Sequence, residues 1–154
     1  KILSDKNIQL VIVGHCMDTN YQNDLAKMID SYGLSSKIAF TPFFESPMKI
    51  MSMLDLIILP TYEETFGLVV AESMLMGTPV IGSNAGGVPE IISDNYNGLL
   101  FESRNYKSLS KKILSIYESE DLRIKLSNNA KIFANEHYNY QKHFTKLTDI
   151  IQRL

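Results

Sequence analysis

Short apolar runs alternate with amphipathic stretches along most of this chain. The apolar runs occupy residues 8–13, 37–41, 55–59, 79–82 and 99–101. A run that is apolar on both faces is typical of a buried parallel strand. The first run therefore predicts a buried strand that ends at Gly14, and the other runs predict four further strands.

Between these runs, apolar residues recur at helical spacing. Leu25, Met28, Ile29 and Tyr32 follow the i, i+3, i+4, i+7 pattern, which predicts a helix that Gly33 ends. The expected helices cover residues 20–32, 46–55, 67–76 and 88–93, and most of the chain beyond residue 105, with a break at residues 138–139 before the last helix.

The alternation of strands and helices predicts the α/β class with a parallel sheet. A chain of 154 residues has the length of one domain. Ligands of such sheets bind beyond the carboxyl ends of the strands. We therefore expect Gly14 and residues 42–44, 61–67 and 83–87 to lie along one edge.

Charge and cysteine content exclude several classes of function. Residues 45–104 carry two basic and eight acidic side chains, which argues against binding of a nucleic-acid backbone. Cys16 is the only cysteine, and His15, His137 and His143 are scattered, so no metal site is predicted. A single cysteine allows no intrachain disulfide, which favours a reducing, cytoplasmic location; we expect no membrane span and no signal peptide, because no apolar run is long enough and the first residues are polar.

The stretch 60–92 carries the candidate site. Thr65, Phe66 and Gly67 precede a helical run whose first N–H groups have no helical partner and attract anions, a diphosphate above all. Glu64 lies just before this helix, and Glu72 lies in a run that we expect to be buried, where paired ribose hydroxyls would satisfy it. Two alternatives stay open: Gly67 tightens a turn, or Glu64 only complements the helix dipole.

Other catalytic motifs are absent from the chain. No G-x-S-x-G elbow, Walker A loop, G-x-G-x-x-G fingerprint or D-x-D pair occurs. A glycosidase with two facing carboxylates stays open, but it does not explain the glycine-containing loops. Glu63 is expected to face solvent.

With these residues in view, the chain resembles the retaining glycosyltransferases of family four, which have the GT-B fold. The signature is E-x7-E, from Glu64 to Glu72, followed by S-M-L-M-G-T-P-V-I-G, G-G-V-P-E-I-I and N-Y-N-G-L-L-F. Upstream, L-V-I-V-G resembles the strand before the family's nucleotide loop. The resemblance covers residues 8–137.

The resemblance implies that residues 1–154 form a single Rossmann-like C-terminal domain, the donor-binding half of a polysaccharide-building hexosyltransferase, with a terminal helix over 140–154. It implies metal-independent, retaining transfer from a nucleotide-diphosphate sugar, without a cofactor. Glu64 would be catalytic and hold the sugar, and Glu72 would hold the ribose. The other implied donor-binding residues are Phe66, Gly67, Leu68 and Val69 around the sugar and diphosphate, Phe44 and Lys49 at the base, and Gly14.

The acceptor, a glycan or lipid-linked molecule, would bind an N-terminal domain that is not in this sequence. The full-length enzyme would be cytoplasmic or peripheral at the inner face of the membrane. The family's V-G-R-L strand and K-G turn, with the Arg and Lys that neutralise the diphosphate, are also not in this sequence, so the sheet would lack a central strand. Pro42 stands where the family often has Gly.

Two further readings stay open, namely another GT-B-like enzyme, such as a nucleotide-sugar epimerase or a phosphorylase, and a non-catalytic nucleotide-binding module. The identities of the sugar, base and acceptor do not follow from the sequence.

Overall fold

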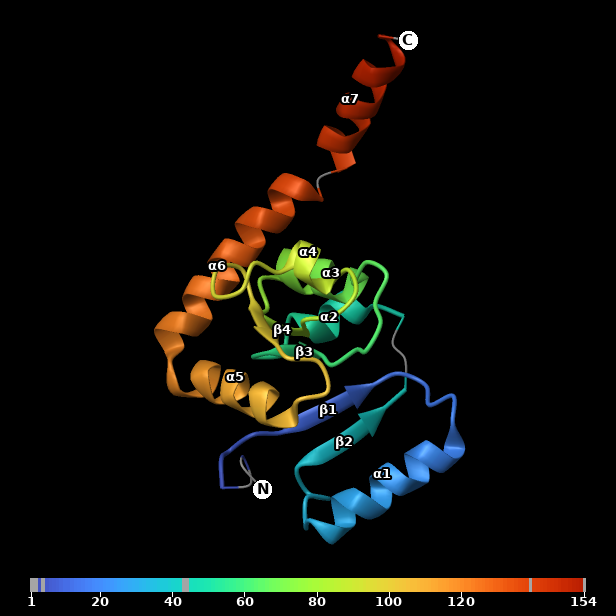
Figure 1. Ribbon diagram of the computed structural model, residues 1–154, viewed down its shortest axis with the longest axis vertical. Coiled ribbons are helices and arrows are strands. Elements are labelled where there is room, and N and C mark those ends of the chain that lie inside the picture. The colour runs from blue at the N-terminus through green and yellow to red at the C-terminus, as the bar shows by residue number, and fades with distance from the viewer. Residues whose placement is uncertain (1–2, 4, 43–44, 139, 154) are drawn as a thin grey trace. The chain divides into compact units, whose positions relative to one another are not determined.

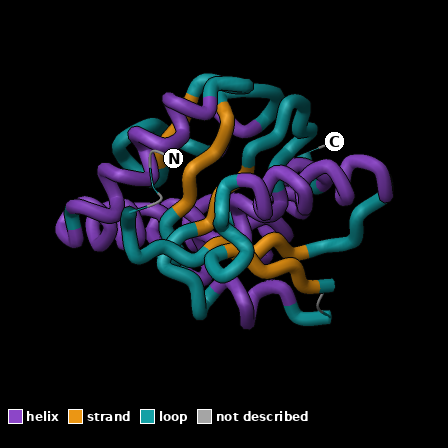
Figure 2. Tube along the Cα trace, turned by 90° about the horizontal axis from the view of Figure 1, so that it is seen from below, coloured by secondary structure: helices purple, strands orange, loops and turns teal. Residues whose placement is uncertain are grey.

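The structure is a computed structural model that describes residues 3, 5–42, 45–138 and 140–153. These residues form two compact units, Lys1–Pro47 and Met48–Leu154 (Figure 1). Each of the five described strands has only three or four residues, so helices and loops make up most of the chain (Figure 2). Each unit is described by itself.

The first unit is a β–α–β arrangement. Strand β1 (Leu10–Val13) pairs in parallel with β2 (Ile38–Thr41), and helix α1 (Thr19–Ser31) connects them. Asp18 caps α1 by accepting the backbone N–H groups of Asn20 and Tyr21, and Gly33 follows the helix with φ +66°. The predicted helix and its terminating glycine are therefore confirmed to within one residue.

Strand β1 differs from its prediction, because it is not buried. Three of its residues are partly exposed: Leu10 (42%), Val11 (39%) and Val13 (43%). In the described part of the chain, β1 has one hydrogen-bonded neighbour, β2, so its other edge is not covered by a strand. An apolar run predicts a strand with two apolar faces, but it does not supply the neighbours that would bury them.

The second unit contains the larger sheet, with strand order β3-β4-β5. Its strands, β3 (Ile57–Leu59), β4 (Val80–Ser83) and β5 (Leu99–Phe101), are parallel, with Ile58 opposite Ile81 and Gly82 opposite Leu100. The strands thus form two separate parallel sheets instead of the single sheet that the alternation predicted.

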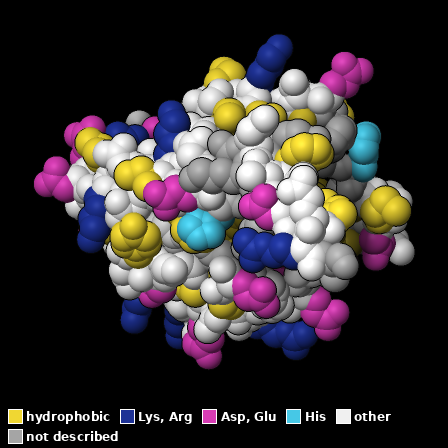
Figure 3. All heavy atoms as spheres, turned by 90° about the horizontal axis from the view of Figure 1, so that it is seen from above, with side chains coloured by type: hydrophobic (Ala, Val, Ile, Leu, Met, Phe, Trp, Pro, Cys, Tyr) yellow, Lys and Arg dark blue, Asp and Glu magenta, His cyan; other side chains and the backbone are white. Residues whose placement is uncertain are grey.

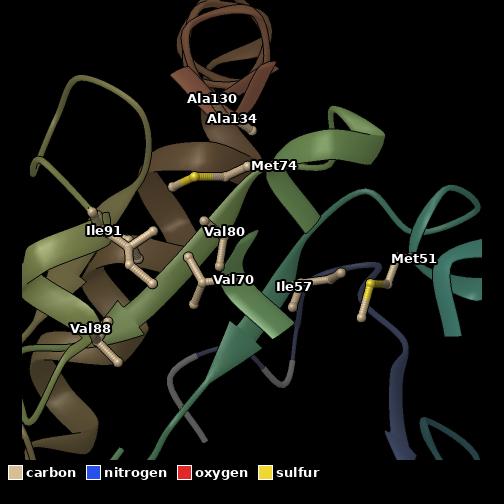
Figure 4. Close-up of a cluster of buried hydrophobic side chains, with 10 residues drawn as sticks. Met51, Ile57, Val70, Met74, Val80, Val88, Ile91, Ala130 and Ala134 are labelled. Carbon is tan, nitrogen blue, oxygen red and sulfur yellow. The ribbon is translucent and has the colours of Figure 1, made fainter. Parts of the chain in front are cut away.

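The central strand β4 is buried on both faces because its side chains alternate between two hydrophobic clusters. Val80 packs with Val70 and Met74 of helix α3 (Leu68–Met76), beneath Ala130 and Ala134 of α6 (Glu120–His137), as Figure 4 shows. Ile81 packs in the second cluster with Leu99, Phe101, Ile116 and Leu126. These clusters hold the carboxyl ends of the three strands in register.

The remaining helices are short connectors or C-terminal helices. Helix α2 (Pro47–Met51) is shorter than predicted, and α4 (Val88–Ile91) has Pro89 in its first turn. Helices α5 (Tyr106–Glu118) and α6 follow β5, with Asn105 and Ser119 as side-chain caps. Helix α7 (Tyr140–Ile151) projects away from the β3-β4-β5 sheet (Figure 1), and its Leu147, Ile150 and Ile151 are exposed.

Candidate functional site

The N-terminus of α3 is an open set of backbone donors. Its N-cap is Gly67, with φ +88° and no side-chain hydrogen bond to the helix. The N–H groups of Val70 and Ala71 donate to the Gly67 carbonyl at 2.9 and 3.3 Å. This leaves the preceding N–H groups, those of Leu68 and Val69, at the positive end of the helix dipole, where an anion binds best.

Glu64 lies beside this helix start. A methyl group built on Gly67 would lie 3.6 Å from the Glu64 Cγ atom, so the Glu64 side chain lies next to the N-cap of α3. The Glu64 side chain is half-buried, whereas the neighbouring Glu63 is exposed, as the sequence predicted. The structure therefore brings Glu64 and the α3 N-terminus together, and it leaves Glu63 facing solvent.

Two glycines after β4 fix the backbone of the Glu64 loop. The Gly87 N–H donates to the Glu64 carbonyl at 2.8 Å. A Cβ atom on Gly86 would lie 2.2 Å from the Glu64 carbonyl oxygen, and one on Gly87 would lie 2.4 Å from that of Thr65. Nearer the strands, the buried Ser83 hydroxyl donates to the Thr61 carbonyl at 2.7 Å. The loops that follow β3 and β4 therefore pack backbone against backbone.

Glu72 lies on the exposed side of α3. It is four residues after Leu68 and three after Val69, which places the three side chains on one face of the helix. Leu68 is 66% exposed and Val69 38%, and Glu72 is half-buried. The expectation of a buried run was wrong at these positions, because the residues of this helix that face the core are Val70, Ala71, Ser73 and Met74.

Phe66 is held from the C-terminal end of α6. Its ring packs edge-to-face on the ring of Tyr138 with 6.0 Å between centroids, and Tyr138 packs in the same way on Phe133 at 6.1 Å. Burial among these rings raises the pKa of the Tyr138 phenol above its usual value. Half of the Phe66 surface stays exposed beside the open α3 amides.

Arg104 and Tyr62 were not among the predicted site residues. The Arg104 guanidinium carbon lies 4.9 Å from the centroid of the Tyr62 ring, which is two residues before Glu64. Arg104 follows β5 at the same edge of the sheet, and the Asn84 N–H joins that edge by donating to the Phe101 carbonyl at 2.8 Å. One signal was available in the sequence, since Arg104 is one of only two basic residues between 45 and 104.

The other predicted donor residues fall in different places. Lys49 is exposed at the end of α2. Gly14 follows β1 in the first unit with φ +136°, and its N–H donates to the Thr41 carbonyl at 3.1 Å. It lines a cavity of about 750 Å³ with Asp18 and Tyr21. Phe44 lies outside the described residues. Within the second unit, the loops that follow β3 and β4 lie together as predicted.

Surface charge and metal ligands complete the description. Acidic and basic side chains are interspersed on the face drawn in Figure 3. Across the described ranges, no group of three or more His, Cys, Asp or Glu residues is placed to share a metal ion. Within the same part of the chain, no helix is both long and apolar enough to cross a bilayer.

A parallel α/β sheet with an uncapped helix N-terminus at the carboxyl end of its strands is typical of phosphate-binding α/β proteins. The family described as “Glycosyl transferases group 1” matches residues 1–133. The chain therefore belongs to the group 1 glycosyltransferases and represents the C-terminal half of their GT-B fold.

Two relatives and two solved structures illustrate the family. The chain is 25% identical over 92% of its length to N-acetyl-alpha-D-glucosaminyl L-malate synthase of Bacillus anthracis, of which it spans 36%. It is 32% identical over 64% of its length to D-inositol 3-phosphate glycosyltransferase of Corynebacterium kroppenstedtii, of which it spans 22%. The chain thus spans about a third or less of these relatives.

The fold is similar to that of Anabaena HepE, solved in complex with UDP-glucose, with a TM-score of 0.90 and 23% identity over 99% of this chain and 43% of that one. It is also similar to the C-terminal domain of a group 1 glycosyl transferase from Francisella tularensis. That TM-score is 0.75 with 21% identity, over 90% of this chain and 92% of that domain.

Proposed function

We propose that this chain is the donor-binding half of a retaining glycosyltransferase that transfers a hexose-type sugar from a nucleoside diphosphate. The observation that carries the proposal is the uncapped N-terminus of α3 at Gly67, with Glu64 packed beside it. Backbone donors would hold the diphosphate, and a carboxylate next to them would accept hydrogen bonds from sugar hydroxyls. An epimerase or a non-catalytic module has no comparable support, because the family match is to transferases.

The roles proposed for the individual residues are those that the family resemblance implies. Glu64 holds hydroxyls of the transferred sugar, and Glu72, about one turn into α3, holds the ribose. The N–H groups of Phe66, Gly67, Leu68 and Val69 meet the sugar and the diphosphate. Negative charge develops on the diphosphate as the glycosidic bond breaks, and fixed N–H dipoles stabilise it without reorganising. Lys49, Phe44 and Gly14 are assigned to the nucleotide end of the donor.

The donor and acceptor classes are supported by the relatives. Anabaena HepE was solved with UDP-glucose, so a UDP-sugar is the first donor to test. The names of the two relatives include L-malate, a dicarboxylate, and inositol 3-phosphate. We infer an anionic acceptor, whose phosphate or carboxylate is bound beside the donor.

Calorimetric titration with UDP-, GDP- and ADP-sugars tests the donor assignment, with the complete natural polypeptide as the protein. Glu64→Gln should weaken binding of the cognate nucleotide sugar about 10- to 100-fold, since it removes charge-assisted hydrogen bonds to the sugar. The same substitution should leave the affinity for the sugar-free nucleotide unchanged. Glu72→Gln should weaken the binding of both the nucleotide sugar and the sugar-free nucleotide, because both contain the ribose.

Glu63→Gln is the matched control, since it removes the exposed carboxylate next to Glu64. It should leave both affinities unchanged. Equal affinities for nucleotide sugar in the Glu64→Gln and Glu63→Gln proteins would disprove the sugar-binding role of Glu64.

A further inference from the structure

Tyr138 joins the end of α6 to the start of α3. Its ring packs edge-to-face on that of Phe66, with 6.0 Å between centroids, and Phe66 directly precedes Gly67, the N-cap of α3. Tyr138 also packs edge-to-face on Phe133 of α6, and both of these rings lie against the hydrophobic cluster that contains Met74 of α3. Tyr138 is therefore anchored to the core and in contact with the candidate site.

The turn before α3 lacks the groups that commonly fix the start of a helix. A Ser, Thr, Asp or Asn at the N-cap would bind a helical N–H group, whereas Gly67 has no side chain and a wide range of backbone conformations. The residue before an N-cap often packs on the fourth residue of the helix. In α3 that fourth residue is Ala71, whose methyl group offers little surface to an aromatic ring. The Phe66 ring rests on Tyr138 instead.

Helix α6 holds α3 at both ends. At the C-terminal end of α3, the Ser127 hydroxyl of α6 donates a hydrogen bond to the Gly77 carbonyl. Between the ends, the two helices share one hydrophobic cluster (Figure 4). At the N-terminal end, the contact is that of Phe66 with Tyr138. Loss of the Tyr138 ring would therefore free the end of α3 that carries the open N–H groups and leave the other end attached.

The loop on the other side of this turn is held independently of Tyr138. The Gly87 N–H donates to the Glu64 carbonyl at 2.8 Å, and a Cβ atom on Gly87 would lie 2.4 Å from the Thr65 carbonyl oxygen. Residues 64–65 are thus fixed by the loop after β4. Phe66 and Gly67 span the distance from this fixed loop to the first turn of α3, and the Phe66 ring is the group that ties this span to the core.

We propose that Tyr138 is a positioning residue of the donor site: its ring holds Phe66 and thereby directs the first N–H groups of α3 toward the diphosphate. The inference rests on the proposed function, which places the diphosphate at that end of the helix. The aromatic ring makes the contact, and edge-to-face pairs have a preferred geometry that an aliphatic side chain does not reproduce. Phenylalanine at position 138 would therefore keep the function, and leucine would lose it.

Hydrogen exchange of the complete natural polypeptide, read by mass spectrometry, tests whether Tyr138 holds the start of α3. In Tyr138→Leu, residues 66–72 should exchange about three- to tenfold faster, because the Val70 and Ala71 N–H groups donate to the carbonyl of Gly67, which the Phe66 contact holds. Residues 73–79, at the other end of α3, should exchange as in the wild type. Tyr138→Phe should match the wild type in both segments.

Ile116→Val is the control for a general loss of stability. It removes a methyl group from a residue that is 5% exposed, in the hydrophobic cluster that does not contain α3. It should leave residues 66–72 with wild-type exchange relative to residues 73–79.

Calorimetric titration with UDP tests whether this position matters to the donor. The affinity for UDP should fall about three- to tenfold in Tyr138→Leu and stay unchanged in Tyr138→Phe and Ile116→Val. Phe66→Leu should lose as much affinity as Tyr138→Leu, and the double variant should lose no more, because both single changes remove the same contact. Additive losses would show that Tyr138 acts through another contact and would overturn the proposal.

Two further results would overturn it. One is an equal change of exchange in residues 66–72 and 73–79 of Tyr138→Leu, which would show a general loss of stability. The other is wild-type affinity for UDP in a Tyr138→Leu protein whose residues 66–72 exchange faster. If UDP does not bind to the wild type, the proposed donor function fails instead, and the exchange of residues 66–72 still decides whether Tyr138 holds the start of α3.

Discussion

Gly86→Ala is expected to displace the loop that carries Glu64. The backbone of Gly86 has φ +56°, and a Cβ atom there would lie 2.2 Å from the carbonyl oxygen and 2.7 Å from the nitrogen of Glu64. Both atoms belong to the backbone, so no side-chain rotation can relieve the overlap. The chain must separate the loops after β3 and β4, which breaks the Gly87–Glu64 hydrogen bond of 2.8 Å.

The expected destabilisation has two parts. An alanine in the left-handed region costs about 1–2 kcal/mol, and overpacking against fixed neighbours costs about 1–3 kcal/mol. We therefore expect a loss of about 2–5 kcal/mol in the free energy of unfolding. Gly77→Ala is the matched control, because Gly77 has φ +75° but a Cβ there would make only ordinary contacts, 3.5 Å from the Ser127 Oγ atom and 3.6 Å from the Lys131 Cδ atom. It should lose only the conformational part, about 1–2 kcal/mol.

Urea denaturation of both variants measures the difference. Following amide signals of the Met48–Leu154 unit restricts the measurement to the unit that contains both glycines. Donor affinity should fall further in Gly86→Ala than in Gly77→Ala, because only the first moves the Glu64 backbone. Equal losses of stability in the two variants would refute the backbone-to-backbone packing on which the site is built.

Two further predictions concern Tyr138 and the chain alone. Because burial raises the pKa of Tyr138, the folded state favours the neutral phenol. This contribution to stability is complete below about pH 10, the pKa of a tyrosine in the unfolded chain, and is lost as the pH rises through the higher pKa of Tyr138 in the folded state. Above about pH 10 the wild type should therefore lose stability relative to Tyr138→Phe, which urea midpoints across that range would measure. Parallel pH profiles of the two proteins would contradict the assignment. The 154-residue chain alone should bind donor weakly and show no transfer in an assay with a panel of nucleotide sugars; turnover equal to that of the complete natural polypeptide would contradict this.

Much of the second unit could be predicted from local sequence. The helix over Leu68–Met76 and the strand over Leu99–Phe101 were expected where they occur, since periodicity and flanking glycines are local signals. The pairing of Glu64 with the α3 N-terminus also followed from spacing. The solvent exposure of the apolar side chains could not be predicted from spacing, as Leu68 and the β1 residues show. An apolar side chain is buried only if another element covers it. A local sequence pattern does not show whether such an element is present.

By itself, the sequence determined the α/β class, the family signature from Glu64 to Glu72 and the solvent-facing Glu63. Only the tertiary structure decided that the strands form two sheets, that Gly86 and Gly87 pack against the Glu64 loop, and that Arg104 rests on Tyr62. The physical reason is the sequence separation of the interacting residues. Helix caps and periodicity act over a few residues, whereas these contacts join segments some 20 to 40 residues apart. Their geometry exists only once the sheet has aligned the strand ends.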